Sequence, residues 1–149
     1  MRLWSIMLVA LLLTVIGVSY RPGDNDNCRG DSSCFFGNLT KIVDGDTLEV
    51  SGEVIRLSLV NTPEKGQSGF DESIQFVESS CKVGEIVLVD EDDMQVSRSH
   101  RRIVAKVYCR NGTFDLNREL VMSGNAEILE KFCGKSEFSD EEWVQNNGC

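Results

Sequence analysis

The stretch "VIRLSLVNTPE", residues 54–64, decides the expected fold. Its aliphatic residues alternate with Arg56 and Ser58, which is the two-residue period of a strand with one buried face. Arg56 is therefore expected to point away from the core. Pro63 cannot donate a ladder hydrogen bond and ends the strand. The end of this strand thus delivers an amide, a hydroxyl and a carboxylate close together in the sequence.

Further strands are expected on both sides of this stretch. They are "LTKIV" (39–43), "TLEV" (47–50), "EIVLV" (85–89) and "RIVAKVYC" (102–109). The acidic run "DEDD", residues 90–93, is expected to separate the last two strands.

Helices are expected in three places. Residues 70–82 carry apolar side chains at the spacing of one helical stripe. "DLNRELVMSG" (115–124) predicts a short helix capped by Asp115 or Asn117. Ser139 and Glu142 have the spacing of a capping box, which predicts a last helix from about Ser139.

Together these elements predict a mainly β fold with some helix (α+β). Five strands, with one helix after the third and another after the fifth, favour an OB-fold-like Greek-key barrel with about three helices. Barrels of this kind often bind oligonucleotides on one face.

The 149-residue chain has room for one domain of ordinary globular composition, with 41% hydrophobic and 26% charged residues. Residues 1–20 read as a signal peptide, with an uncleaved membrane anchor as the alternative. The remainder divides into a disulfide-closed extension, the barrel domain and a disulfide-tied helical tail, which cover 21–37, 38–132 and 133–149. Either reading of the leader places the mature chain outside the cytosol, secreted or anchored through residues 3–20.

Six cysteines in a small exported chain predict a disulfide framework, because the same count would point to metal or redox chemistry only in the cytosol. Six cysteines allow fifteen pairings. Locality favours Cys28 with Cys34 and Cys133 with Cys149, which leaves Cys81 with Cys109.

The formal net charge of −9 weighs against nucleic acid, which rewards basic surfaces. A local cluster of cations can still make one cleft positive on an acidic molecule. The arginines at 56, 98, 101 and 102 are the candidates for such a cluster.

Four motifs occur in order along the chain: "VDGDTLEV", "IRLSLVNTPE", "RRIVAKVY" and "LNRELVMSGNAE". With them the chain resembles the thermonuclease (staphylococcal-nuclease-like) family over about residues 38–130. The combination of "DGDT" with a following arginine strand and "NTPE" is specific, whereas "DGDT" alone is weak. The resemblance implies a five-stranded barrel with three helices and a calcium-dependent phosphodiesterase acting on DNA, RNA or both.

The resemblance also implies a metal site. Asp46 would bind Ca²⁺ through its carboxylate, Asn61 through its amide oxygen and Thr62 through its backbone carbonyl. Oxygen ligands of this kind suit calcium, and few protein ligands leave room for water and a phosphate. Asn61 stands where the family commonly has Asp, and one fewer negative ligand weakens calcium binding. The alternative is that Asp46 and Asn61 only serve turns, which both residue types favour.

Three further residues take catalytic roles under the resemblance. Arg56 and Arg102 would bind the phosphate, because a planar guanidinium bonds two oxygens at once. Arg102 is expected opposite Arg56, with Arg101 as the alternative if the register slips by one residue. Glu64 is the candidate general base that orients and deprotonates the attacking water.

The chain departs from the family at two aromatic positions. His100 stands where an aromatic phosphate contact is expected, and Glu130 stands near the position of an aromatic after the second helix. These departures favour one rival hypothesis, a non-catalytic nucleic-acid or ligand binding module on the same barrel. A disulfide-rich structural protein is a third hypothesis. In each case we expect a monomer with no protein partner, and membrane contact only if the leader stays uncleaved.

Overall fold

The computed structural model describes residues 26–95 and 102–149. The expected leader, residues 1–20, lies outside the described residues. The same holds for three residues of the expected phosphate site: Arg98, His100 and Arg101.

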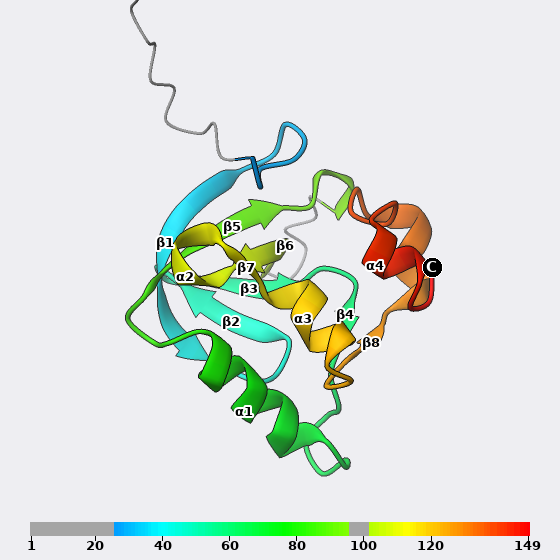
Figure 1. The fold of residues 1–149 in the computed structure, drawn as a ribbon. Helices are drawn as coiled ribbons and strands as arrows, with labels where there is room; N and C mark the ends of the chain where they lie inside the picture. Colours follow the sequence, from blue (N-terminus) through cyan, green and yellow to red (C-terminus); the bar gives the residue numbers. More distant parts are fainter. Residues whose placement is uncertain (1–25, 96–101) are drawn as a thin grey trace, which may run out of the picture.

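Five strands form a closed mixed barrel (Figure 1). The strands run in the order β3, β2, β1, β5, β6, and β6 pairs back onto β3. This last pairing is parallel, whereas the other barrel pairings are antiparallel. The prediction of an α+β, OB-fold-like barrel is confirmed. The bounds of the barrel strands are β1 Cys34–Ile42, β2 Thr47–Val50, β3 Glu53–Leu57, β5 Ile86–Glu91 and β6 Arg102–Tyr108.

Shorter elements decorate the barrel. The helices are α1 Phe70–Ser80, α2 Cys109–Gly112, α3 Leu116–Met122 and α4 Glu142–Gln145. The short strands are β4 Val60–Asn61, which pairs with β8 Glu127–Ile128, and β7 Phe114–Asp115. In Figure 1, α1 lies along one end of the barrel, and the C-terminal tail with α4 lies on the side of β4 and β8.

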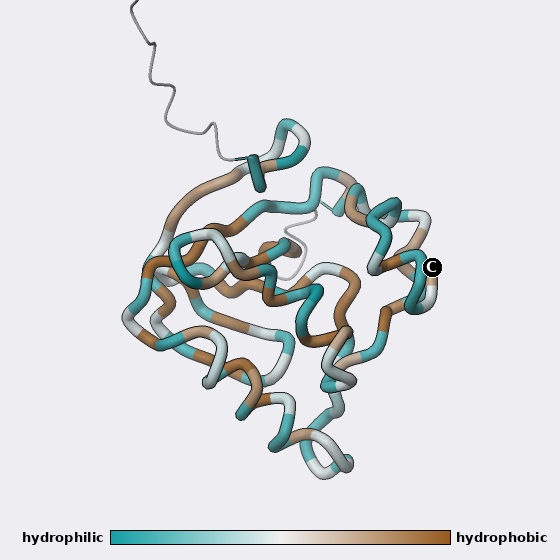
Figure 2. Tube along the Cα trace, in the orientation of Figure 1, coloured by the Kyte–Doolittle hydropathy of each residue, from teal (hydrophilic) through white to brown (hydrophobic). Residues whose placement is uncertain are grey.

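The expected alternation holds in β3 and fails just after it. Ile55 and Leu57 are buried, while Arg56 on the other face keeps part of its side chain exposed. The expected single strand over 54–60 is wrong, because Leu59 adopts a left-handed φ of 63°. This turn sends the following residues out of the barrel sheet to form β4. In Figure 2, hydrophobic positions recur along the barrel strands, while the loop before β1 is mostly hydrophilic.

Three further expectations need correction. The first strand begins at Cys34, so the disulfide-closed extension runs directly into the barrel. The last helix begins at Glu142 and has no side-chain cap, because the Ser139 hydroxyl donates to the carbonyl of Ser136. The acidic run does more than separate two strands, since Asp90 and Glu91 belong to β5 and both are buried.

The acidic run ties the extension and the tail to the barrel. Asp92 is fully buried, and its carboxylate accepts hydrogen bonds from the Ser58 hydroxyl at 2.7 Å and the Glu137 amide at 3.1 Å. Asp93 accepts hydrogen bonds from the amides of Asp31 and Ser32. Buried carboxylates that accept several hydrogen bonds fix the segments that donate to them.

Three disulfides close the covalent framework: Cys28–Cys34, Cys81–Cys109 and Cys133–Cys149. The pairing favoured by locality is confirmed. Three disulfides indicate an oxidising, extracellular type of environment. Within residues 26–95 and 102–149, no helix has both the length and the apolar character to span a bilayer.

Candidate functional site

Asp46 lies at the centre of the candidate site. It is 6% exposed, and its carboxylate makes four contacts. Oδ1 forms an ion pair with Nη1 of Arg56 at 3.0 Å and accepts a hydrogen bond from the Thr47 hydroxyl at 3.2 Å. Oδ2 accepts from the amide and the hydroxyl of Thr62, at 2.9 Å and 3.0 Å. These contacts occupy about all four acceptor positions of a carboxylate.

Burial dominates the electrostatics of this ion pair. It raises the pKa of Asp46 above the usual carboxyl range, and the positive charge of Arg56 opposes that rise. Burial likewise lowers the pKa of Arg56, against the attraction of the Asp46 and Asp44 carboxylates. Each charge therefore offsets the free-energy cost of burying the other, and removing either partner would leave an uncompensated buried charge.

Only one of the three guanidinium nitrogens of Arg56, Nη1, contacts acceptors among the described residues. Its Nη1 donates to the carbonyl of Val60 at 2.8 Å, in addition to the contact with Asp46. In the described part of the chain, no group accepts a hydrogen bond from its Nε or Nη2. Arg56 is thus fixed by one nitrogen while two others remain for a ligand.

The turn that carries Asp46 is fixed locally. The Asp44 carboxylate accepts from the amide of Asp46 at 3.1 Å, which is an Asx turn. Only glycine fits at position 45, because a Cβ there would lie 2.5 Å from Oγ of Ser73 and 2.9 Å from a Thr62 methyl carbon. The turn therefore packs directly against α1 and the residues after β4.

Arg56 lies beside a cavity of about 580 Å³, which we call the basic cleft. Of the described residues that line it, four are cationic and Glu64 alone is acidic. The cations are Arg56, Arg102, Lys131 and Lys135. A cleft with this balance, on a chain of net charge −9, is suited to an anion.

The expected position of Arg102 is partly wrong. In the parallel pairing of β3 with β6, Val104 lies opposite Arg56, and Arg102 lies opposite Val54. Arg102 is therefore a diagonal neighbour of Arg56 on the same face of the sheet. Both side chains line the basic cleft, and the charge of Arg102 acts on Arg56.

Asn61 and Glu64 complete the polar lining. Asn61 lies in β4, and in the described part of the chain its side-chain amide has no hydrogen-bond partner. Glu64 is exposed, its backbone amide donates to the Gln67 side chain at 2.7 Å, and its charge acts on Arg56. The structure thus brings Arg56, Asn61, Glu64 and Arg102 to one cleft, with Asp46 and Thr62 in contact beside them.

Sequence reasoning missed part of this lining. Phe132 lines the basic cleft, whereas Glu130, expected in place of an aromatic, is exposed and outside the lining. An aromatic is therefore present, two residues further along. Lys131 and Lys135 carry no sequence signal, because their position depends on how the tail folds back. Asp44 could have been found, since it shares the "DGD" turn with Asp46.

The oxygen groups around Asp46 fit a hard cation such as Ca²⁺. The Asn61 amide oxygen, the Thr62 carbonyl and the carboxylates of Asp44 and Asp46 are the available kinds of donor, and all are oxygen. A cation at Asp46 must displace one of these four contacts, because together they occupy the carboxylate. The Thr47 hydroxyl is uncharged and makes the longest of the four contacts, so it is the cheapest to displace.

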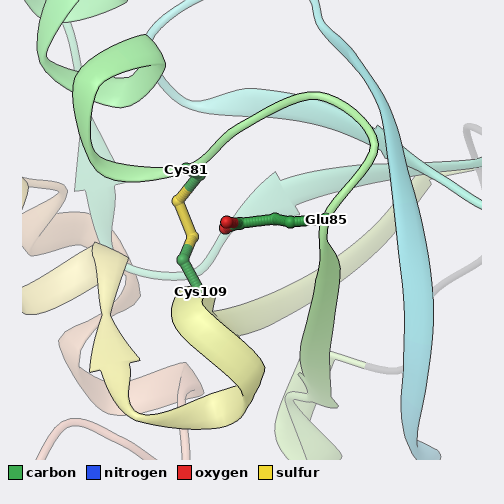
Figure 3. A group of neighbouring side chains, drawn as sticks. All are labelled: Cys81, Glu85 and Cys109. Carbon is green, nitrogen blue, oxygen red and sulfur yellow. A yellow bond between two sulfur atoms is a disulfide. The ribbon is translucent and has the colours of Figure 1, made fainter.

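A different group of metal-ligand residues lies away from the cleft. Cys81, Glu85 and Cys109 are close together, and they are the one such group of three in residues 26–95 and 102–149. Their two sulfur atoms are bonded to each other in a disulfide, toward which Glu85 points (Figure 3). Neither sulfur is a thiolate, so this group is not a metal site in the oxidised protein.

A scan against models of protein families found no match to this chain, and a search of curated proteins found none either. The resemblance to the thermonuclease family therefore rests on the quoted motifs and stays a prediction. The barrel, the cleft and the Asp46–Arg56 pair stand independently of it, as properties of the structure.

Proposed function

We propose that this protein is an exported, calcium-dependent phosphodiesterase that hydrolyses DNA, RNA or both. One observation carries the proposal: the basic cleft combines two arginines with a carboxylate and an unpaired amide, drawn from separate segments of the chain. Phosphodiester hydrolysis needs these parts, namely cations for the phosphoryl oxygens and a base for the water. Export accords with the three disulfides.

The residues divide the chemistry among them. Arg56 and Arg102 donate to the non-bridging oxygens, where charge develops in the transition state. Glu64 takes a proton from water as the water oxygen forms its bond to phosphorus. The ester P–O bond on the opposite side breaks, and the leaving oxygen takes a proton from solvent. Asp46, Asn61 and Thr62 would hold calcium, which would supply further positive charge to the reaction when bound.

A non-catalytic binding module is the second candidate, and the saturation of Asp46 favours it. All four acceptor positions of this carboxylate are in use within the protein, as a purely structural role requires. Such a module would use Arg56 and Arg102 to hold phosphate without cutting it.

One experiment separates the two candidates. The oxidised protein is incubated with single-stranded DNA and with RNA, in calcium or in chelator, beside Glu64→Gln. The enzyme predicts cleavage that needs calcium and falls about 10²- to 10⁴-fold in the Glu64 variant. Retention of nucleic acid without cleavage in every condition selects the binding module and overturns the proposal of an enzyme.

A further inference from the structure

The segment that follows β8 builds one wall of the basic cleft. Its 3-10 segment, Glu130–Lys135, contributes Lys131, Phe132 and Lys135 to the lining. The remaining lining comes from the barrel and the segments next to it. Half of the cationic residues of the cleft therefore come from a segment that follows the barrel in the sequence.

This wall is anchored on both sides. Before it, the amide of Leu129 donates to the carbonyl of Leu59 at 2.8 Å. After it, the amide of Glu137 donates to the buried carboxylate of Asp92 at 3.1 Å. Cys133, between the two lysines, is bonded to Cys149. The backbone that carries the lysines is thus held in place rather than free to swing away.

The two ammonium groups are not neutralised by any carboxylate within residues 26–95 and 102–149. Among the described residues, no carboxylate forms an ion pair with Lys131 or Lys135. Nζ of Lys131 lies 5.1 Å from the ring centroid of Phe132, which itself lines the cleft. Both lysines are exposed, so a flexible anion can reach them.

We propose that Lys131 and Lys135 bind a second phosphate group of a strand whose first phosphate lies at Arg56 and Arg102. The cleft then selects an oligonucleotide over a single phosphate ester, because only a chain presents two phosphates at once. This inference rests on the proposed function for the first phosphate. An acidic peptide is the rival ligand, because guanidinium and ammonium groups bind carboxylates as well as phosphates. The Phe132 ring in the lining favours the strand, since a nucleobase can stack on it.

The test measures binding apart from cleavage. Affinity is determined by fluorescence anisotropy in the Glu64→Gln background, with calcium present. The probe is a single strand of about twelve nucleotides, a length within the range one barrel of this type covers. A nucleoside monophosphate and polyglutamate are the comparison ligands. The variant is Lys131→Ala with Lys135→Ala, and the control is Lys41→Ala with Lys82→Ala, which removes the same charge from exposed lysines outside the cleft.

Loss of the one phosphate held by the two lysines has a defined salt signature. The slope of log affinity against log salt should become shallower by about 0.7, and the affinity for the strand should fall about threefold at roughly 0.2 M salt. The affinity for the nucleoside monophosphate should fall much less. The control variant should have the same salt slope and the same affinity for the strand as the parent. Thermal unfolding of each variant shows that it is folded.

Three outcomes overturn the inference: an unchanged slope in the cleft variant, an equal loss in the control variant, or polyglutamate binding as tightly as the strand. A parent protein that does not bind the strand also overturns it. Failure of the proposed function looks different. In that case the strand binds with the expected lysine dependence, yet the protein with native Glu64 does not cut it in calcium.

Discussion

Nη1 of Arg56 lies 3.0 Å from Oδ1 of Asp46, and both side chains are largely withdrawn from solvent. The arginine of β3 is thereby fixed to the turn between β1 and β2, while its other nitrogens face no acceptor within the described residues. The relationship joins stability to function, because the group expected to hold phosphate is also half of a buried ion pair.

Breaking this pair should destabilise the protein. We expect Asp46→Asn to cost about 3 kcal/mol in the free energy of unfolding, because a buried guanidinium loses its compensating charge. A double-mutant cycle with Arg56→Gln, measured by urea denaturation, should give a coupling energy of about 1 to 3 kcal/mol. The exposed pair Arg29–Asp140 is the contrast, and its coupling energy should be much smaller because solvent screens the two charges. Equal coupling in both pairs would contradict the buried role of Asp46.

Asn61→Asp should tighten calcium binding. A carboxylate in place of the amide adds a negative ligand at the edge of the cleft, so the calcium midpoint should fall about tenfold. The calcium midpoint is measured directly by titration calorimetry and indirectly from the calcium dependence of cleavage. Asn146→Asp adds the same charge at an exposed site in the tail. An unchanged midpoint in the Asn61 variant would remove this residue from the metal shell.

Asp90 should make stability depend on pH. Its side chain is fully buried, Oδ1 has no hydrogen-bond partner within the described residues, and burial raises its pKa to about 7. Between its ordinary pKa and about 7, the folded protein holds a proton that the unfolded chain releases. The contribution of Asp90 is therefore favourable in acid and is lost as pH rises through 7.

Asp90→Asn should abolish this dependence. The free energy of unfolding is measured for the parent and the variant at pH values on either side of the pKa, and the difference between the two proteins isolates the one group. We expect the free energy of unfolding of the variant to increase relative to that of the parent as pH rises. Asp71→Asn, at an exposed position, should show no such trend. A constant difference between parent and Asp90 variant would place the proton elsewhere.

Asn117→Ala should weaken the barrel itself. Asn117 is fully buried, accepts from the amide of Val107 at 3.0 Å, and donates to the carbonyls of Ser58 and Ala105. Its removal leaves buried backbone groups without partners, at a cost of about 2 to 4 kcal/mol. Denaturation of Asn146→Ala, an exposed residue, provides the control. A small loss at Asn117 would mean that water replaces its hydrogen bonds.

Much of the local structure could be predicted because it depends on neighbours in the sequence. The alternation around Arg56 is encoded within one strand, and α1 was predicted within two residues of its observed end. Asp115 caps α3 as expected, accepting from the amide of Arg118 at 3.0 Å. The failures came where a distant segment intervenes. The acidic run was expected only to separate two strands, and the amides that donate to its carboxylates come from the extension and the tail.

The sequence by itself determined most of the strand pattern and the order of the polar motifs, and it favoured the observed disulfide pairs by locality, because period, spacing and turn chemistry are short-range properties. Only the tertiary structure decided that Arg102 lies diagonally from Arg56, and that Lys131, Phe132 and Lys135 share their cleft. The register between β3 and β6 and the return of the tail depend on contacts between residues far apart in the chain. No local pattern specifies such contacts, since they follow from packing the whole barrel at once.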